Sequence, residues 1–84
     1  MELPCKVGEP VWIIESYMRK HNAPINGTVT KFEVFNDAIM TVQVLIWADL
    51  GEGKKNYGFS KECFGKIVFT SREEAEAALK EQEG

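Results

Sequence analysis

Apolar and polar residues alternate most clearly along residues 39–48. An apolar residue at every second position is typical of a strand that buries one of its two faces. The pattern therefore predicts a strand here, and its inward-facing side chains are expected to be Met40, Val42, Val44, Ile46 and Ala48.

The other face of this predicted strand changes character along its length. It begins polar, with Thr41 and Gln43, and ends with Leu45 and Trp47. Two large apolar side chains at one end of a strand need a cover, which is either another element of the chain or a partner.

Two further strands are expected before this one. Residues 7–15 form a turn that leads into a β-branched and aromatic strand, with Pro10 at its first position or on an edge. Residues 17–24 are polar and aperiodic, which predicts a loop. The strand from Ile25 to Phe35 contains Gly27 as a bend or bulge, and its apolar residues move from odd to even positions. One extra residue near Thr30 would restore a single apolar face.

The chain after residue 35 contains several short elements. The pattern predicts a tight turn at 36–37, a glycine-punctuated hairpin loop at 49–56, a strand at 57–59 with both rings on one face, one helical turn at 60–65 and a last strand at 66–69.

A helix is predicted for residues 72–82. Ser71 and Glu74 form a capping box, in which the hydroxyl accepts from the third amide of the helix. Ala75, Ala78 and Leu79 form a narrow stripe of mostly small side chains that would let the helix lie close to a sheet.

Together these elements predict one mainly β (α+β) domain over residues 1–84. Five short strands followed by a helix indicate a small, partly open, five-stranded antiparallel barrel. The helix is expected either to plug one end of the barrel or to cover the face that carries Leu45 and Trp47.

The two ends of the chain resemble a known group of proteins. The segment FGKIVFTSREEAEAAL, residues 64–79, is similar to the ending of many short, uncharacterised bacterial and phage-encoded proteins with an FGKxVF strand followed by a T-[RK]-E-E-A-E-x-A-L helix. The start LPCKVGEPVW, residues 3–12, is similar to their PCKVGD-x-V-[WY] start. Thr70-Ser71 stands where Leu-Thr is usual. The resemblance implies a phage or mobile-element origin and a small barrel of the Src-homology or Tudor type. It implies no catalytic residues.

Composition and charge narrow the class of protein. The chain is 44% hydrophobic and 27% charged, as folded domains are. Residues 1–70 contain eight acidic and eight basic side chains, so the net charge of −3 comes entirely from the C-terminal helix. Such a chain lacks the overall positive field of a non-specific nucleic-acid binder. No apolar run approaches the roughly 20 residues that span a bilayer. We expect a cytoplasmic protein with no membrane partner.

Few residues suggest catalysis, a metal or a cofactor. Cys5 and Cys63 are expected to be free thiols, and with His21 they make one ligand too few for a closed zinc site. His21 has no carboxylate near it in sequence to orient it as a catalytic base. The stretch 51–55 lacks the spacing of a phosphate-binding loop and is expected to be a hairpin turn. We therefore expect no catalytic residue, no metal and no cofactor.

Two surface features remain as candidate binding sites. The first is an apolar docking patch of Trp12, Leu45 and Trp47, with coverage by the helix as the alternative. The second is a pair of basic loops with aromatic rings, suited to phosphate or nucleic acid, with two solvated loops as the alternative. Its residues are Tyr17, Arg19, Lys20, Lys54, Lys55 and Tyr57.

The sequence favours a non-enzymatic module that docks on a host or phage protein, with a defence factor as one class of target, in the manner of an anti-CRISPR protein. The alternative is a small barrel that binds nucleic acid or nucleotides through the basic loops. The sequence fits a monomer, or a homodimer formed by pairing of open sheet edges. It identifies neither the partner nor whether Cys5 and Cys63 lie close together.

Overall fold

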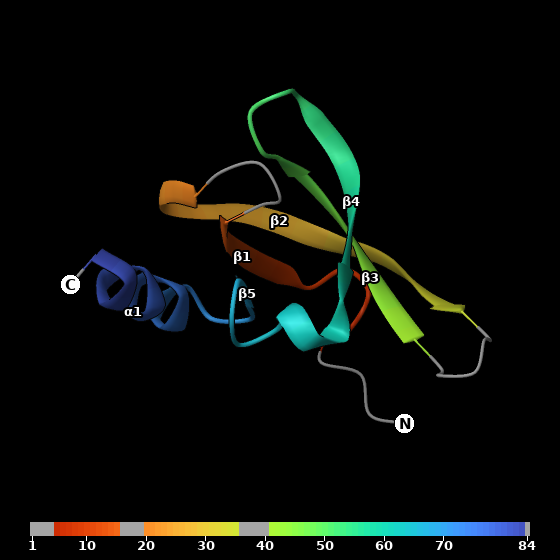
Figure 1. Ribbon diagram of the computed structural model, residues 1–84. Coiled ribbons are helices and arrows are strands. Elements are labelled where there is room, and N and C mark those ends of the chain that lie inside the picture. The colour runs from red at the N-terminus through yellow and green to blue at the C-terminus, as the bar shows by residue number, and fades with distance from the viewer. Residues whose placement is uncertain (1–4, 16–19, 36–40, 84) are drawn as a thin grey trace.

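The computed structural model describes residues 5–15, 20–35 and 41–83, which form one open antiparallel sheet and a C-terminal helix (Figure 1). The spatial order of the strands is β4-β3-β2-β1-β5. The elements are β1 (Pro10–Glu15), β2 (Lys20–Phe35), β3 (Thr41–Asp49), β4 (Lys54–Ser60), the 3₁₀ turn η1 (Lys61–Cys63), β5 (Val68–Phe69) and α1 (Arg72–Glu83). This architecture confirms the predicted fold class. Among the described residues, no helix has the length and apolar character needed to cross a membrane.

The inner face of the sheet carries the main core. Val42, Val44, Ile46 and Ala48 of β3 are each at most 3% exposed, which confirms the predicted inward face of this strand. Met40 lies outside the described residues. Val44, Ile46 and Ala48 belong to the main core cluster, whose other buried residues are Cys5, Val11, Ile13, Val29, Leu50, Phe59 and Val68.

The predicted bulge near Thr30 is present in β2. Val29 pairs with Ile46 but Lys31 pairs with Leu45, so Thr30 is the extra residue. Gly27 is not at the bulge; it pairs with Val11. A Cβ at Gly27 would lie 2.7 Å from Ile46 Cγ2, so a glycine is needed here for close packing of the inner face.

The predicted loop at 17–24 is partly wrong, because β2 begins at Lys20. The register between β1 and β2 shifts between Ile13, which pairs with Ile25, and Glu15, which pairs with Lys20. Pro24 lies inside this irregular stretch, where its missing N–H does not break a regular ladder. The extended backbone therefore continues through a polar segment that has no strand-like pattern.

The hairpin between β3 and β4 is tighter than predicted. Lys54 and Lys55 lie in β4 and pair with Asp49 and Ala48, so the assignment of 54–56 to the loop is wrong. Asp49 Oδ1 accepts hydrogen bonds from the amides of Gly51 at 2.9 Å and Gly53 at 3.2 Å, which closes the turn within residues 50–53.

The shorter elements follow the prediction with small changes. Tyr57 and Phe59 pair with Ile46 and Val44, so their rings share the inner face as expected. The predicted helical turn at 60–65 is the 3₁₀ turn η1, and the last strand is reduced to β5.

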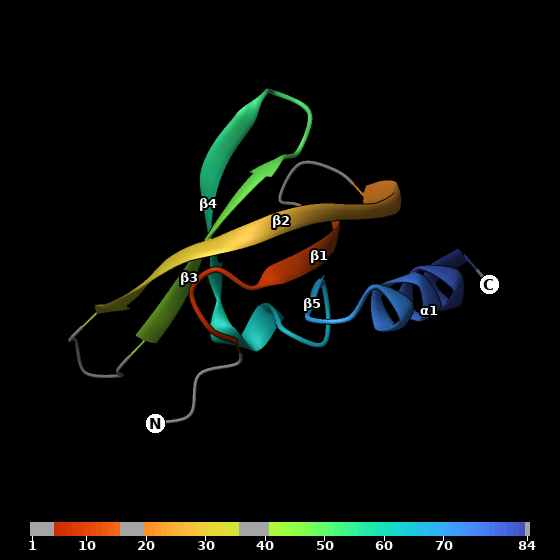
Figure 2. The same cartoon turned by 180° about the vertical axis from the view of Figure 1, so that it is seen from behind.

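Helix α1 packs on the outer face of the sheet against β1, β2 and β5, so it does not reach Leu45 and Trp47 on β3 and does not close the end of a barrel (Figures 1 and 2). A second buried cluster forms beneath it, made of Ile14, Phe69, Ala75 and Leu79. Because Ile13 faces the main core and Ile14 faces the helix, β1 is buried on both faces.

The helix begins and packs as its sequence predicts. The Glu74 amide donates to Ser71 Oγ at 3.5 Å, which is long for a hydrogen bond. This contact is one of the two hydrogen bonds of a capping box. Ala75 is fully buried and Leu79 is 8% exposed. The apolar stripe thus contacts the sheet, and Leu79 is its only large side chain.

Replacement of this anchor tests how much the helix contributes to stability. Leu79→Ala should lower the free energy of unfolding by roughly 2–4 kcal/mol, because it removes buried methyl groups and leaves a cavity. Chemical denaturation followed by circular dichroism measures the change. The control is Lys80→Ala, an exposed neighbour, which should change stability by less than about 0.5 kcal/mol. Equal effects of the two substitutions would show that α1 does not pack through Leu79.

Candidate functional site

Trp47 and Leu45 lie together on the outer face of β3, where no helix covers them. Trp47 is 43% exposed, and Leu45 is half-buried. Trp47 is paired across the sheet with Thr28 of β2 and Asn56 of β4. An exposed indole between two short polar side chains presents a broad apolar face to solvent. We call the residues Thr28, Leu45, Trp47 and Asn56 the Trp47 patch.

A polar bridge crosses β3 beside the patch. Thr30 Oγ1 lies 3.1 Å from the Leu45 carbonyl oxygen and 2.8 Å from Asn56 Oδ1. The bulge places the Thr30 hydroxyl where it can donate to this carbonyl, since a bulge disrupts the ladder locally. The hydroxyl has one proton, so it donates to one of these two oxygens at a time and links β2 either to the backbone of β3 or to Asn56 of β4.

Trp12 does not belong to this patch. It lies on β1, paired with Asn26 and Phe69, and its half-buried side chain packs against the cluster beneath α1. Strand β2 separates it from Trp47, a spacing of about 10 Å for two strand intervals. The structure thus brings together two of the three residues predicted for the docking patch. The third packs against the helix cluster.

The sequence alone did not single out Thr28, Thr30 and Asn56 as neighbours of Trp47. The shift of the apolar residues of β2 from odd to even positions did indicate an extra residue near Thr30. This residue sets which side chains of β2 lie beside Leu45 and Trp47. Which residue of β4 lies beside Trp47 depends on the length of the hairpin turn, and the glycines in this turn do not determine its length.

The basic residues predicted to form a second site have different environments. Lys54 and Lys55 point to opposite faces of β4, since neighbouring residues in a strand alternate. Lys55 pairs with Glu52 at 3.3 Å, and Lys31 pairs with Glu33 at 3.8 Å. Carboxylates therefore neutralise one lysine on each face of the sheet.

The rest of that predicted site is only partly described. Tyr17 and Arg19 lie outside the described residues, and for Lys20 only the backbone is described, at the start of β2. Tyr57 is half-buried and faces inward, beside the main core. The structure therefore does not assemble these residues with Lys54 and Lys55 into one described groove.

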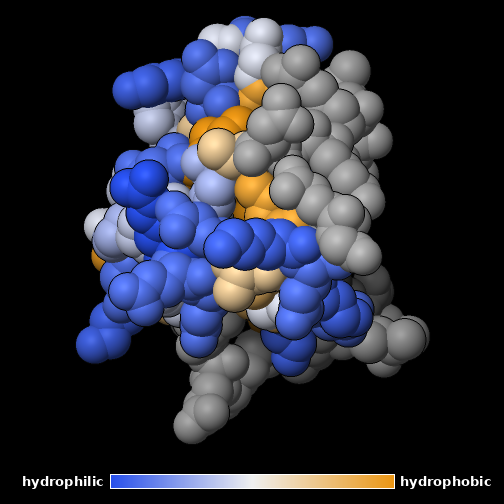
Figure 3. Space-filling model, turned by 90° about the vertical axis from the view of Figure 1, so that its left-hand side faces the viewer, coloured by the Kyte–Doolittle hydropathy of each residue, from blue (hydrophilic) through white to orange (hydrophobic). Residues whose placement is uncertain are grey.

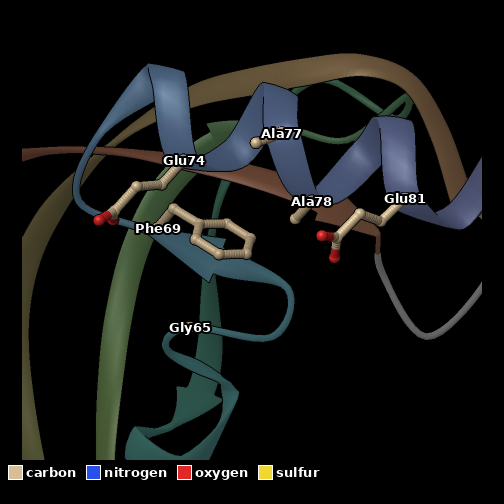
Figure 4. Close-up of a pocket in the computed structure, with 6 residues that line it drawn as sticks. All are labelled: Gly65, Phe69, Glu74, Ala77, Ala78 and Glu81. Carbon is tan, nitrogen blue, oxygen red and sulfur yellow. The ribbon is translucent and has the colours of Figure 1, made fainter.

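A shallow groove of about 390 Å³ lies beside α1. Figure 4 shows the Phe69 ring beneath the helix, with the side chains of Glu74 and Glu81 to either side of it. Ala77, Ala78 and Gly65 complete the lining. Phe69 is 7% exposed, so the groove offers little apolar surface. Hydrophilic side chains also dominate the described surface on this side of the molecule, with a narrow apolar band (Figure 3).

The two cysteines are free thiols that share the main core. Cys5 is buried in it and Cys63 packs against it, with Cys63 Sγ 3.8 Å from Ser60 Oγ. Burial, with a smaller contribution from the Glu9 carboxylate, raises the pKa of the Cys5 thiol to about 11. Among the described residues, no group of three His, Cys, Asp or Glu side chains is placed to hold a metal ion.

Comparison with protein-family models, with curated proteins and with solved structures finds no match to this chain.

The raised pKa of Cys5 predicts a loss of stability at alkaline pH. The folded state keeps the Cys5 proton between about pH 9 and 11, whereas the unfolded state releases it, so the free energy of unfolding falls as pH rises through this window. Denaturation of the wild type and of Cys5→Ala at several pH values measures the effect. The wild type should lose more stability than the variant over this range. Parallel curves for the two proteins would contradict the prediction.

Proposed function

We propose that this protein is a non-enzymatic interaction module that docks on another protein through the Trp47 patch. The observation that carries the proposal is the 43% exposure of Trp47 on the outer face of a sheet whose other side is a packed core. Tryptophan is among the residues that most often dominate binding energy at protein interfaces. A rigid strand holds it there, so little conformational entropy is lost on binding.

The surroundings of Trp47 support a protein partner. Thr28, Asn56 and the Thr30 bridge supply short hydrogen-bonding side chains around one aromatic anchor. An apolar centre with a polar rim is the usual composition of a protein interface. The described charges nearby are balanced, with Lys31 beside Glu33.

The class of partner follows from the resemblance of the chain ends to short phage and bacterial proteins. We infer a phage or mobile-element origin, cytoplasmic action and a target among host or phage proteins. A defence factor, bound and inhibited in the manner of an anti-CRISPR protein, is the target that suits such an origin. Trp12 belongs to this proposal only as a residue that supports the helix beside the sheet.

The second candidate is binding of single-stranded nucleic acid. Lys54 favours it, because it shares the outer face of the sheet with Trp47, where a base could stack. The pairing of Lys31 and Lys55 with carboxylates weakens this reading. A salt titration with short oligonucleotides separates the candidates, since backbone contacts to nucleic acid weaken steeply as salt rises.

Charge insertion at the patch tests the proposal. Trp47→Lys should reduce capture of the partner from a lysate of the native host at least tenfold, because loss of an interface tryptophan commonly costs 2 kcal/mol or more. The matched control is Val7→Lys, at another exposed apolar residue, 58% exposed and outside the patch. It should leave capture unchanged. Quantitative mass spectrometry of the captured proteins provides the measurement.

Thermal unfolding of both variants accompanies the capture experiment. Trp47→Lys should unfold at nearly the wild-type temperature, because the side chain is exposed. If it unfolds the domain, Trp47 is a core residue and the patch does not exist. If it stays folded and still captures every wild-type partner, the proposed function is wrong.

A further inference from the structure

Strand β4 is a free edge of the sheet beside the Trp47 patch. It ends the strand order, and among the described residues no backbone hydrogen bond outside the sheet involves residues 54–60. Figures 1 and 2 show the β3–β4 hairpin extending away from the rest of the domain. Unpaired N–H and C=O groups on such an edge can pair with another extended chain.

On the outer face of this edge strand, Gly58 has no side chain of its own, and the side chains of Gln43 and Leu45 on β3 lie beside it. Gly58 pairs with Leu45, and a Cβ at Gly58 would lie 2.9 Å from Gln43 Oε1 and 3.4 Å from Leu45 Cδ2. With no side chain at Gly58, Leu45 is the nearest apolar group behind the edge. A large apolar side chain on an added strand, placed opposite Gly58, can lie over the backbone of this glycine and contact Leu45.

The same face carries a cation at the start of the strand. Lys54 is paired in register with Asp49, but Asp49 Oδ1 accepts the amides of Gly51 and Gly53. Among the described residues Lys54 makes no ion pair, whereas Lys55 on the other face pairs with Glu52. An acidic side chain opposite Lys54 would be favoured.

We propose that β4 receives an extended segment of the partner protein as an added antiparallel strand. The segment has a large apolar residue opposite Gly58 and an acidic residue four positions later, opposite Lys54. All the strand pairs of this sheet are antiparallel, and antiparallel pairing is slightly more stable per residue. This inference rests on the proposed function and names the form in which the partner binds.

A second copy of the chain fits this edge less well. The side chains of β4 that face outward are Lys54, Asn56 and Ser60, with Gly58 between them. None is large and apolar, so a symmetric β4–β4 pair places no apolar side chain over Gly58 and leaves Leu45 uncovered.

Two synthetic peptides test the inference on the intact protein. The peptide TTFTSTETT places phenylalanine four residues before glutamate, and TTETSTFTT reverses their order. NMR titration of the ¹⁵N-labelled protein should show shifts in β4, Leu45 and Trp47 with the first peptide. The peptide should also protect β4 amides from exchange, and the reversed peptide should bind more weakly.

Charge reversal identifies the cation. Lys54→Glu should weaken binding of TTFTSTETT about fivefold, and a peptide with lysine in place of glutamate should restore it. The matched control is Lys55→Glu, which makes the same charge change on the opposite face and should have a smaller effect. Gly58→Val should abolish binding, because its side chain displaces Gln43 and takes the place beside Leu45 that the phenylalanine of the peptide would occupy.

Three results would overturn the inference. These are no shift in β4 at millimolar peptide, equal binding of the two peptides, or β4 amides already protected in a dimer of the free protein. If neither peptide binds but Trp47→Lys still fails to capture the partner, strand addition at β4 is wrong and the proposed function stands. If Trp47→Lys retains that partner, the proposed function falls instead.

Discussion

The pairing of β2 with β3, with its one-residue bulge at Thr30, determines which side chains of the sheet form the core. Before the bulge Val29 pairs with Ile46, and after it Lys31 pairs with Leu45. A shift of one residue in a strand turns every side chain to the other face. The bulge therefore keeps the apolar residues of both halves of β2 against the same inner face of β3. Leu45 and Trp47 alternate with the buried residues of β3 and therefore lie on the outside.

The position of the helix decides which outer surface remains open. The outer face of β1 is buried because α1 lies on it, and the second cluster around Ile14 and Leu79 holds the helix there. The face of β3 is left without such a cover. The same packing that gives the small domain a second apolar cluster thus leaves Trp47 accessible, which links the stability of the fold to its candidate binding surface.

Strong local patterns made much of this fold predictable. The alternation in β3, the parity change in β2 and the capping residue Ser71 each reflect a local physical rule, and the structure follows all three. The start of β2 was not predictable in this way, because residues 20–24 are polar and include Pro24, and tertiary pairing holds them extended. The sequence does contain a signal for the location of the helix. The unbroken apolar run from Val11 to Ile14 indicates a strand that is buried on both faces, and therefore one that another element covers.

The candidate site was predictable only in part, for a related reason. Leu45 and Trp47 stood out because they break the polar pattern of their face, but whether they were covered depended on where a distant helix packs. Trp12 has the same apolar character and a different environment, which sequence position alone does not distinguish. The neighbours of Trp47 depend on the register of three strands.

The exposure of Trp47 relative to Trp12 shows whether the outer face of β3 is open to solvent. Each tryptophan can be studied alone, in the variants Trp12→Phe and Trp47→Phe, by quenching of its fluorescence with acrylamide. Trp47, observed in Trp12→Phe, should emit at longer wavelength and be quenched more strongly than Trp12, observed in Trp47→Phe. A Trp47 that is quenched less than Trp12 would contradict the register of β3 and the open face that follows from it.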